Sequence, residues 1–287
     1  MTRHRIALLL LLPTLVLSGC GSSSKATVAS PTGTAAAADC SAASLKTHTA
    51  GTLTLATDKP AYEPWFSKDD PTNGKGYEAA VGYALADKLG FSKDKVTWVR
   101  ASFNSVVAPG PKSFDLDLNE VSITEKRRVA VDFSSGYYDV RQAVIARKGT
   151  KAAAAKSVAD LAGLRLGAQV GTTSYKAITD QVKPTQQPRV YDTNDLAVAA
   201  LKNGQVDALV LDLPTSFYAT AAQVQDGVIV GQLPQAGGQP EQFGAVLDKG
   251  SPLTGCVTKA LDALRADGTL TRLQKTFLTD AGAPELS

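Results

Sequence analysis

A guanidinium that follows a run of small polar side chains is the most informative group in this 287-residue sequence. The stretch from Phe114 to Tyr138 reads FDLDLNEVSITEKRRVAVDFSSGYY and contains Arg127. An arginine side chain is a rigid planar fork that matches a carboxylate in two parallel hydrogen bonds. The alternating apolar residues at the start of the stretch predict a short strand that delivers hydroxyl and amide groups to its end. A solvated surface turn is the alternative for a single arginine.

Polar side chains stand just beyond the ends of four predicted strands. The strands are expected at 53–57, 114–118, 164–168 and 208–211, and the polar residues that follow them are Asp58, Asn119 with Glu120, Thr172 with Thr173, and Asp212. Ligands of open α/β sheets bind in the crevice outside the carboxyl ends of the strands. The sequence therefore predicts a binding site built from these side chains.

The charges of these groups predict the kind of ligand. Arg127 suits a carboxylate, and so does the helix start at Thr172 and Thr173, although ordinary helix capping also explains that turn. Asp212 suits an ammonium group. Because an unpaired buried charge costs several kcal/mol, a zwitterion is tolerated only where both of its charges are paired. An α-amino acid fits this arrangement.

The stretch from Phe114 to Tyr138 resembles the signature of the family-3 solute-binding proteins of bacterial ABC importers, the polar amino-acid type. The resemblance spans roughly residues 52–278. It implies that Arg127 and the Thr172–Thr173 turn hold the ligand α-carboxylate, that Asp212 accepts the α-ammonium, and that Ser122 binds the ligand. The sequence departs from the family pattern at Glu120, where a small residue is usual, and at Gly136, where proline is common.

The resemblance also implies a lining for the ligand side chain. Tyr62 and Trp65 match aromatic positions that pack on it, with core packing as the alternative, and Asp58 matches a polar position nearby. An extra residue near 59–61 and a shortened segment at 103–113 leave the pocket wall open. If Asp58 and Glu120 both face the ligand, a cationic amino acid such as arginine or lysine is favoured. If Glu120 pairs instead with Lys126 or another lobe residue, a polar neutral ligand such as glutamine or cystine is equally compatible.

Strands and helices alternate from Thr52 onward, which predicts an α/β fold. Helices are expected at 77–89, 175–182, 195–202, 253–264 and 270–278, and further strands at 96–99, 142–147 and 243–247. The resemblance implies the two-lobed type II periplasmic-binding-protein fold with two hinge strands. Lobe 1 is expected at 51–143 and 243–279, and lobe 2 at 144–242. Ligand binding between the lobes is expected to close the hinge.

The N-terminus has the pattern of a lipoprotein signal peptide over residues 1–19. Arg3 and Arg5 precede an apolar run that is too short to cross a bilayer, and the run ends in Leu-Ser-Gly before Cys20. This ending resembles the bacterial lipobox, with cleavage before Cys20 and lipid on its sulfur. A plain signal peptide is the alternative. Residues 20–50 are expected to form the lipid anchor and a flexible linker, which places the protein on the extracytoplasmic face of the cell membrane.

Of the three cysteines, Cys40 and Cys256 remain after Cys20 is assigned to lipid. An even pair in an oxidising compartment predicts a disulfide, here from the start of the domain to a C-terminal helix. No spacing of His, Cys or acidic residues indicates a metal site, and no cofactor is expected.

The charge balance does not indicate nucleic-acid binding. The formal net charge of +3 becomes +1 when Arg3 and Arg5 leave with the signal peptide, because 3 − 2 = 1. The predicted function is the monomeric substrate-binding component of an ABC importer, with the permease and ATPase subunits as partners and no enzymatic activity. A tethered sensor for a membrane receptor is the alternative. An enzyme on the same fold is a further alternative, with Glu120 as the single candidate general acid or base.

Overall fold

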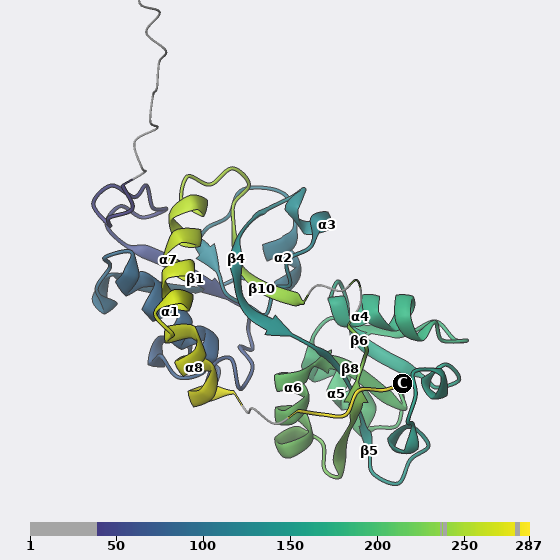
Figure 1. Cartoon of the computed structure of the whole chain (residues 1–287). Coiled ribbons are helices and arrows are strands. Elements are labelled where there is room, and N and C mark those ends of the chain that lie inside the picture. The colour runs from purple at the N-terminus through teal and green to yellow at the C-terminus, as the bar shows by residue number, and fades with distance from the viewer. Residues whose placement is uncertain (1–38, 236, 238–239, 279–281) are drawn as a thin grey trace, which may run out of the picture. The chain divides into compact units, whose positions relative to one another are not determined.

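The computed structural model describes residues 39–235, 237, 240–278 and 282–287 (Figure 1). Cys20 and the predicted signal peptide lie outside these residues, so the expectations about them stay predictions. Within the described part of the chain, no helix has the length and apolar character needed to cross a membrane.

The first sheet carries the N-terminal part of the domain and one strand from near the C-terminus. Its strand order is β2-β1-β3-β10-β4, with β1 parallel to β2 and β3, and β10 antiparallel to β3 and β4. Helices α1, α7 and α8 pack against one another beside this sheet. The elements are β1 (Leu53–Thr57), β2 (Val96–Arg100), β3 (Leu116–Asp117), β4 (Asp132–Val140), β10 (Glu241–Leu247), α1 (Tyr77–Lys88), α2 (Phe103–Val107), α3 (Glu125–Arg128), α7 (Thr254–Ala266) and α8 (Thr269–Phe277).

The second sheet is built from the middle of the chain. Its order is β7-β6-β8-β5-β9, with β6 parallel to β7 and β8, and β5 antiparallel to β8 and β9. Separate apolar clusters support the two sheets. The elements are β5 (Gln142–Arg147), β6 (Leu166–Gln169), β7 (Arg189–Tyr191), β8 (Ala208–Asp212), β9 (Gly227–Gln232), α4 (Thr173–Ala177), α5 (Asn194–Lys202) and α6 (Leu213–Tyr218).

Two passages of the chain connect strands of one sheet to strands of the other. β4 runs into β5 through Arg141 alone, and β9 leads to β10 through residues 233–240. Figure 1 shows β4 continuing directly toward the second sheet. The α/β, two-lobed fold is therefore as expected, and we use lobe 1 and lobe 2 for the parts built on the first and second sheets. The exact residue bounds of the lobes stay predictions.

Several strands differ from the sequence expectation. The strand expected at 114–118 is only two residues long, because the carboxylate of Asp115 accepts the Thr54 N–H at 2.7 Å and so replaces a ladder contact. The strand expected at 164–168 begins at Leu166, since the Leu164 N–H closes a turn on the Leu161 carbonyl. β4, β7 and β9 were not expected. β4 contains a Ser-Ser-Gly run and pairs with β10 through register shifts, which hide its alternation.

The C-terminal segment 282–287 packs on lobe 2. Gln232 of β9 donates its N–H to the Pro284 carbonyl at 2.8 Å and accepts the Leu286 N–H at 2.9 Å. The side chain of Leu286 is 3 % exposed and belongs to the apolar cluster of lobe 2. The chain thus ends on the second sheet after α8 has packed beside the first.

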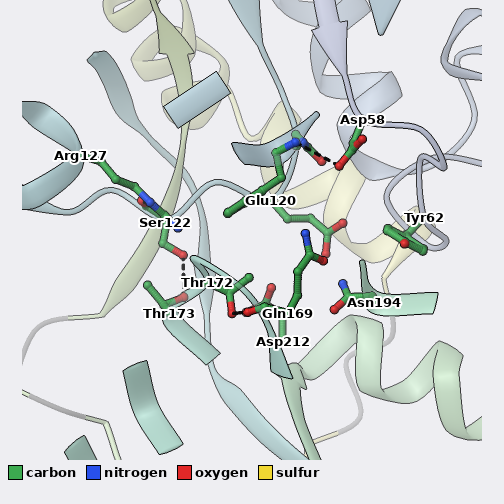
Figure 2. Close-up of a pocket in the computed structure, with 12 residues that line it drawn as sticks. Asp58, Tyr62, Glu120, Ser122, Arg127, Gln169, Thr172, Thr173, Asn194 and Asp212 are labelled. Carbon is green, nitrogen blue, oxygen red and sulfur yellow. Dashed lines mark hydrogen bonds between the residues drawn. The ribbon is translucent and has the colours of Figure 1, made fainter. Parts of the chain in front are cut away.

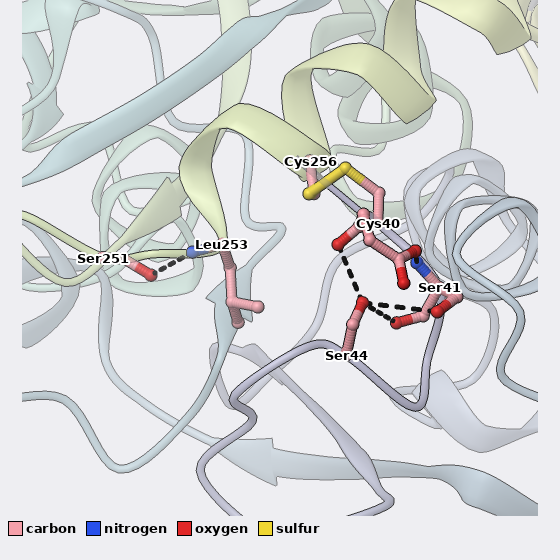
Figure 3. Close-up of a disulfide and its surroundings, with 7 residues drawn as sticks. Cys40, Ser41, Ser44, Ser251, Leu253 and Cys256 are labelled. Atoms are coloured by element: carbon pink, nitrogen blue, oxygen red, sulfur yellow. Dashed lines mark hydrogen bonds between the residues drawn. A yellow bond between two sulfur atoms is a disulfide. The ribbon is translucent and has the colours of Figure 1, made fainter. Parts of the chain in front are cut away.

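A disulfide joins Cys40 to Cys256, as predicted (Figure 3). Cys256 lies in α7, and the Cα atoms of the pair are 5.4 Å apart. Next to Cys40, Ser44 donates its hydroxyl to the Asp39 carbonyl at 2.7 Å. The bond fixes the start of the described domain to a C-terminal helix of lobe 1.

Candidate functional site

A pocket lies between residues of the two lobes (Figure 2). Every predicted ligand-binding residue except Trp65 lines it. Gln169, Asn194, Phe103 and Asn119 complete the wall. The full lining is Asp58, Tyr62, Phe103, Asn119, Glu120, Ser122, Arg127, Gln169, Thr172, Thr173, Asn194 and Asp212.

Strand ends deliver most of these groups. Asp58 directly follows β1, Glu120 stands three residues after β3, and Asp212 is the last residue of β8. Thr172 caps α4 just after β6, where its hydroxyl accepts the Tyr175 N–H. The carboxyl ends of parallel strands meet at one edge of a sheet, so each of the two sheets brings its residues to the pocket.

Arg127 is a buried cation held by backbone carbonyls. Its side chain donates to the Ser122 carbonyl at 2.6 Å and to the Gly171 carbonyl of lobe 2 at 3.0 Å, and it lies 5.2 Å from the centre of the Phe103 ring. The residue is 9 % exposed, and no ion pair among the described residues includes it. Burial lowers the pKa of the guanidinium to about 10, which leaves it charged at neutral pH. The site therefore offers a fixed positive charge to an anion.

Polar groups from both lobes meet beside Arg127. The hydroxyls of Ser122 and Thr173 are 3.2 Å apart, and Ser122 donates to the Glu241 carboxylate at 2.5 Å. In Figure 2, Arg127, Ser122 and Thr173 lie on one side of the view. This side of the pocket can hold a ligand carboxylate by one guanidinium and two hydroxyls.

Asp212 is a hydrogen-bond acceptor that lobe 2 contributes to the pocket. The side-chain amide of Gln142 donates to its carboxylate at 2.7 Å, and the Gln142 oxygen accepts the Ser174 hydroxyl at 2.6 Å. Burial and the nearby Glu241 charge raise the pKa of Asp212 well above its usual value, and the Gln142 hydrogen bond opposes this. A ligand ammonium would favour the ionised carboxylate.

Glu120 reaches into the pocket from a left-handed backbone position with φ of 53°. Its backbone N–H donates to the Glu78 carboxylate at 2.7 Å, and its own carboxylate accepts the Thr215 hydroxyl of lobe 2 at 2.9 Å. The partner of Glu120 is thus Thr215, and no ion pair with Lys126 is present among the described residues. Burial, with the charges of Glu78 and Asp212, raises the pKa of Glu120 well above its usual value.

Two further carboxyl groups lie behind the pocket in lobe 1. Glu78 in α1 and Asp117 in β3 are both 0 % exposed. Glu78 accepts the Tyr137 hydroxyl, and burial raises the pKa of Glu78 to about 7. Both carboxylate oxygens of Asp117 lack a hydrogen-bond partner among the described residues, and burial raises the pKa of Asp117 well above its usual value.

Trp65 is the one predicted ligand-binding residue that stands behind the pocket wall. Its side chain is 0 % exposed and packs edge-on against Tyr138 and Phe243, at ring-centre distances of 5.2 and 5.3 Å. Gly76, at φ of 100°, admits the close approach of the Trp65 backbone, because a Cβ there would lie 2.4 Å from the Trp65 carbonyl oxygen. Trp65 therefore lies in the core, which was the alternative to pocket lining. Tyr62, in contrast, lines the pocket, and its hydroxyl accepts the Asp195 N–H of lobe 2 at 3.3 Å.

Sequence reasoning missed several lining residues. Gln169 ends β6 and is open to the same strand-end argument, and Asn194 opens α5. Phe103 begins α2 inside the segment expected to be shortened. No sequence pattern pointed to Glu241 or Gln142, because they reach the site only where β10 and β5 come together. The described residues contain no group of three or more His, Cys, Asp or Glu side chains suited to a metal ion.

Residues 53–280 match the family model for bacterial extracellular solute-binding proteins, family 3. The L-arginine-binding protein of Pseudomonas aeruginosa is 29% identical over 239 residues, which cover 79% of this chain and 90% of that protein. An ancestral arginine-binding protein bound to glutamine aligns with a TM-score of 0.67 and 31% identity, over 80% of this chain and 99% of that one. The ancestral amino acid-binding protein AncCDT-1, a precursor of cyclohexadienyl dehydratase, aligns with a TM-score of 0.65 and 29% identity, over 79% and 95% of the two chains.

Proposed function

Because this chain belongs to the bacterial extracellular solute-binding proteins of family 3, we propose that it binds an amino acid between its lobes and delivers it to the permease of an ABC importer. Residues from both lobes form the wall of the pocket. A ligand that touches both walls stabilises the closed arrangement by its differential affinity for that state.

The polar backbone of the ligand has a place in this pocket. Its α-carboxylate is assigned to Arg127, supported by the hydroxyls of Ser122 and Thr173 and by the helix start that Thr172 caps. Its α-ammonium is assigned to Asp212. Arg127 and Asp212 come from different lobes, so pairing both ligand charges requires closure.

We further propose a cationic amino acid as the ligand. The observation that carries this is the presence of two lining carboxylates, Asp58 and Glu120, in addition to Asp212, against a single lining guanidinium. A neutral zwitterion would use Arg127 and Asp212 and leave the other two carboxylates without a cation. A positively charged side chain compensates them, which lowers the cost of their burial.

A polar neutral amino acid such as glutamine or cystine is the second candidate. It is supported by the hydrogen bond from Thr215 to Glu120, which already satisfies one carboxylate oxygen. The ancestral arginine-binding protein that aligns with this chain was observed with glutamine. The relatives described above are named as binding proteins, and we propose the same for this chain rather than an enzymatic role.

We also infer that the mature protein begins at Cys20, carries lipid there, and works as a monomer tethered outside the cytoplasm. The inference rests on the lipobox-like sequence and the low-complexity segment after it. A tethered sensor for a membrane receptor would share these features. Neighbouring genes for a permease and an ATPase would favour transport over sensing.

A thermal-shift screen tests the ligand class. The protein from Cys40 onward is heated with each of the twenty amino acids and with ornithine, citrulline and cystine. A ligand at 1,000 times its Kd raises the free energy of unfolding by about 4 kcal/mol. We expect shifts with arginine, lysine or ornithine, and the bound ligand should be recovered chemically unchanged.

Two variants give the screen its controls. Glu120→Gln should weaken cationic ligands about tenfold, because it removes a charge-assisted contact, and should change neutral ligands little. Arg127→Ala should abolish all shifts while the fold is retained. Shifts confined to neutral amino acids would replace the cationic class, and a complete absence of shifts would contradict amino-acid binding.

A further inference from the structure

A hydrogen-bond relay crosses the cleft and ends on the carboxylate assigned to ligand charge. The indole Nε1–H of Trp65 in lobe 1 donates to the Thr215 hydroxyl of lobe 2 at 2.8 Å. Thr215 lies 2.9 Å from the Glu120 carboxylate, back in lobe 1. One hydroxyl of lobe 2 thus bridges two groups of lobe 1.

The direction of this relay follows from the chemistry of its members. An indole nitrogen can only donate, so the Thr215 oxygen must accept from Trp65. The single hydroxyl proton is then free to point to Glu120, whose carboxylate can only accept when ionised. Donation to a carboxylate favours its charged form. The relay therefore opposes the protonation of Glu120 that burial favours, and it turns the carboxylate toward one fixed position.

The two lobe 1 members of the relay are placed independently of lobe 2. Trp65 is fully buried among aromatic rings, with Tyr138 and Phe243 nearest. Glu120 is held from behind by the hydrogen bond from its backbone N–H to Glu78. Only Thr215 arrives with the other lobe. It is 4 % exposed and sits in the first turn of α6, three residues after Asp212.

Other hydrogen bonds between the lobes do not reach Glu120. Arg127 contacts Gly171, Ser122 contacts Thr173, and Tyr62 contacts Asp195. Among the hydrogen bonds of the described residues, the Glu120 carboxylate accepts from the Thr215 hydroxyl, and the Glu120 backbone N–H donates to the Glu78 carboxylate. Thr215 therefore links lobe closure to the orientation of this carboxylate.

We propose that Thr215 is a positioning residue that sets the preference for cationic over neutral amino acids, by orienting Glu120 across the cleft when the lobes close. The proposal rests on the proposed function, because it requires a cationic ligand near Glu120. A hydroxyl of lobe 2 thereby controls how a carboxylate of lobe 1 discriminates between ligands. The α6 turn that carries Thr215 thus serves both the ammonium site and the side-chain site.

Thr215→Val tests this role, because it preserves the shape of the side chain and removes the hydroxyl. Affinities of the mature protein for arginine and glutamine are measured by titration calorimetry. We expect the arginine affinity to fall about tenfold and the glutamine affinity to change less than about threefold. Thr215→Ser retains the hydroxyl and should restore the wild-type affinity ratio.

Trp65 supplies a second readout that does not depend on affinity. The chain contains two tryptophans, so Trp98→Phe leaves Trp65 as the only indole. In this background, ligand binding should shift the Trp65 emission, and adding Thr215→Val should remove that shift. If Thr215→Val fails to fold, Thr215→Ala takes its place in both measurements.

The outcomes separate this proposal from the function it rests on. A wild-type protein that prefers neutral amino acids contradicts the cationic ligand class, and the relay proposal with it. A wild-type preference for arginine that survives in Thr215→Val refutes the relay alone. Equal losses for both ligands in Thr215→Val also refute it, since they indicate a general contribution to closure.

Discussion

At the scale of single residues, the site combines one buried cation with an excess of buried acids. Arg127 is bound by backbone carbonyls, which fix its position without neutralising it. Glu78 holds the Glu120 backbone in a left-handed conformation from behind the pocket. Asp117 lies in the same region with no hydrogen-bond partner for its carboxylate among the described residues. Such acids favour the protonated form until a cation arrives.

Glu78 makes folding stability depend on pH. Its pKa is about 7 in the folded protein, above the usual glutamate value, so the folded state binds its proton more tightly than the unfolded state. This contribution is fully present below the usual glutamate pKa and is lost as the pH rises through 7. Glu78→Gln should reduce the loss of stability between pH 5 and pH 8 by on the order of 3 kcal/mol. Urea unfolding at several pH values measures the slope.

The control for this prediction is an exposed carboxylate. The side chain of Glu125 is 94% exposed in its contact with Arg128, so Glu125→Gln should leave the pH dependence unchanged. Because the pKa values of Asp117, Glu120 and Asp212 are also raised, some slope will remain in Glu78→Gln. A slope equal to that of the wild type would show that Glu78 is ionised at neutral pH in the folded protein.

At the scale of elements, short strands and the turns after them position the chemistry. β3 is only two residues long, and the polar segment behind it leads directly to Glu120 and Ser122. β8 ends in Asp212, and α6 begins at the next residue, so one strand end and one helix turn supply Asp212 and Thr215. The C-terminal segment 282–287 is a further element, because it pairs with β9 and covers the apolar cluster of lobe 2.

Leu286 gives this C-terminal segment its hold on lobe 2. The side chain is 3 % exposed and lies over Gly231, where an added Cβ would come within 2.8 Å of the leucine. Leu286→Ala should lower the free energy of unfolding by about 2–5 kcal/mol, as is usual for a truncated core leucine. Leu196→Ala, at a residue 52% exposed, should change it by less than about 0.5 kcal/mol. Equal unfolding midpoints in urea for the two variants would show that the segment is not anchored.

At the scale of the whole molecule, two lobes share one site and a disulfide fixes the N-terminal end of the domain. The link from Cys40 to Cys256 closes a sequence separation of 216 residues and restricts the unfolded chain. The start of the described domain is therefore a fixed point on lobe 1. Opening and closing of lobe 2 need not move this point.

The anchoring of the whole chain depends on Cys20 in the proposed function. Cys20→Ser should release the protein from the membrane fraction and abolish incorporation of labelled palmitate, because the acceptor sulfur is lost. Cys40→Ser is the matched control, and it should remove the disulfide while retaining the lipid. Membrane association of Cys20→Ser equal to that of the wild type would exclude lipid on this residue as the anchor.

Local patterns explain which features of the fold could be predicted from the sequence. Apolar runs bounded by polar or glycine residues predicted β1, β5, β8 and helix α1 within a few residues of their observed bounds. β4 escaped prediction because its pairing with β10 shifts register, which breaks the alternation that marks a strand. The C-terminal segment escaped because its burial comes from contacts with β9 rather than from its own composition.

The sequence by itself determined the α/β class, the disulfide pair and the polar groups that stand at strand ends, because each follows from residues close together in the chain or from a count of cysteines. Only the tertiary structure decided what those groups contact. Trp65 and Thr215 are 150 residues apart, and Glu120 meets Thr215 over a separation of 95. Such contacts depend on how two separately built lobes meet, and no local pattern encodes the distance between them. The partner of Glu120 was therefore open in the sequence and is Thr215 in the folded protein.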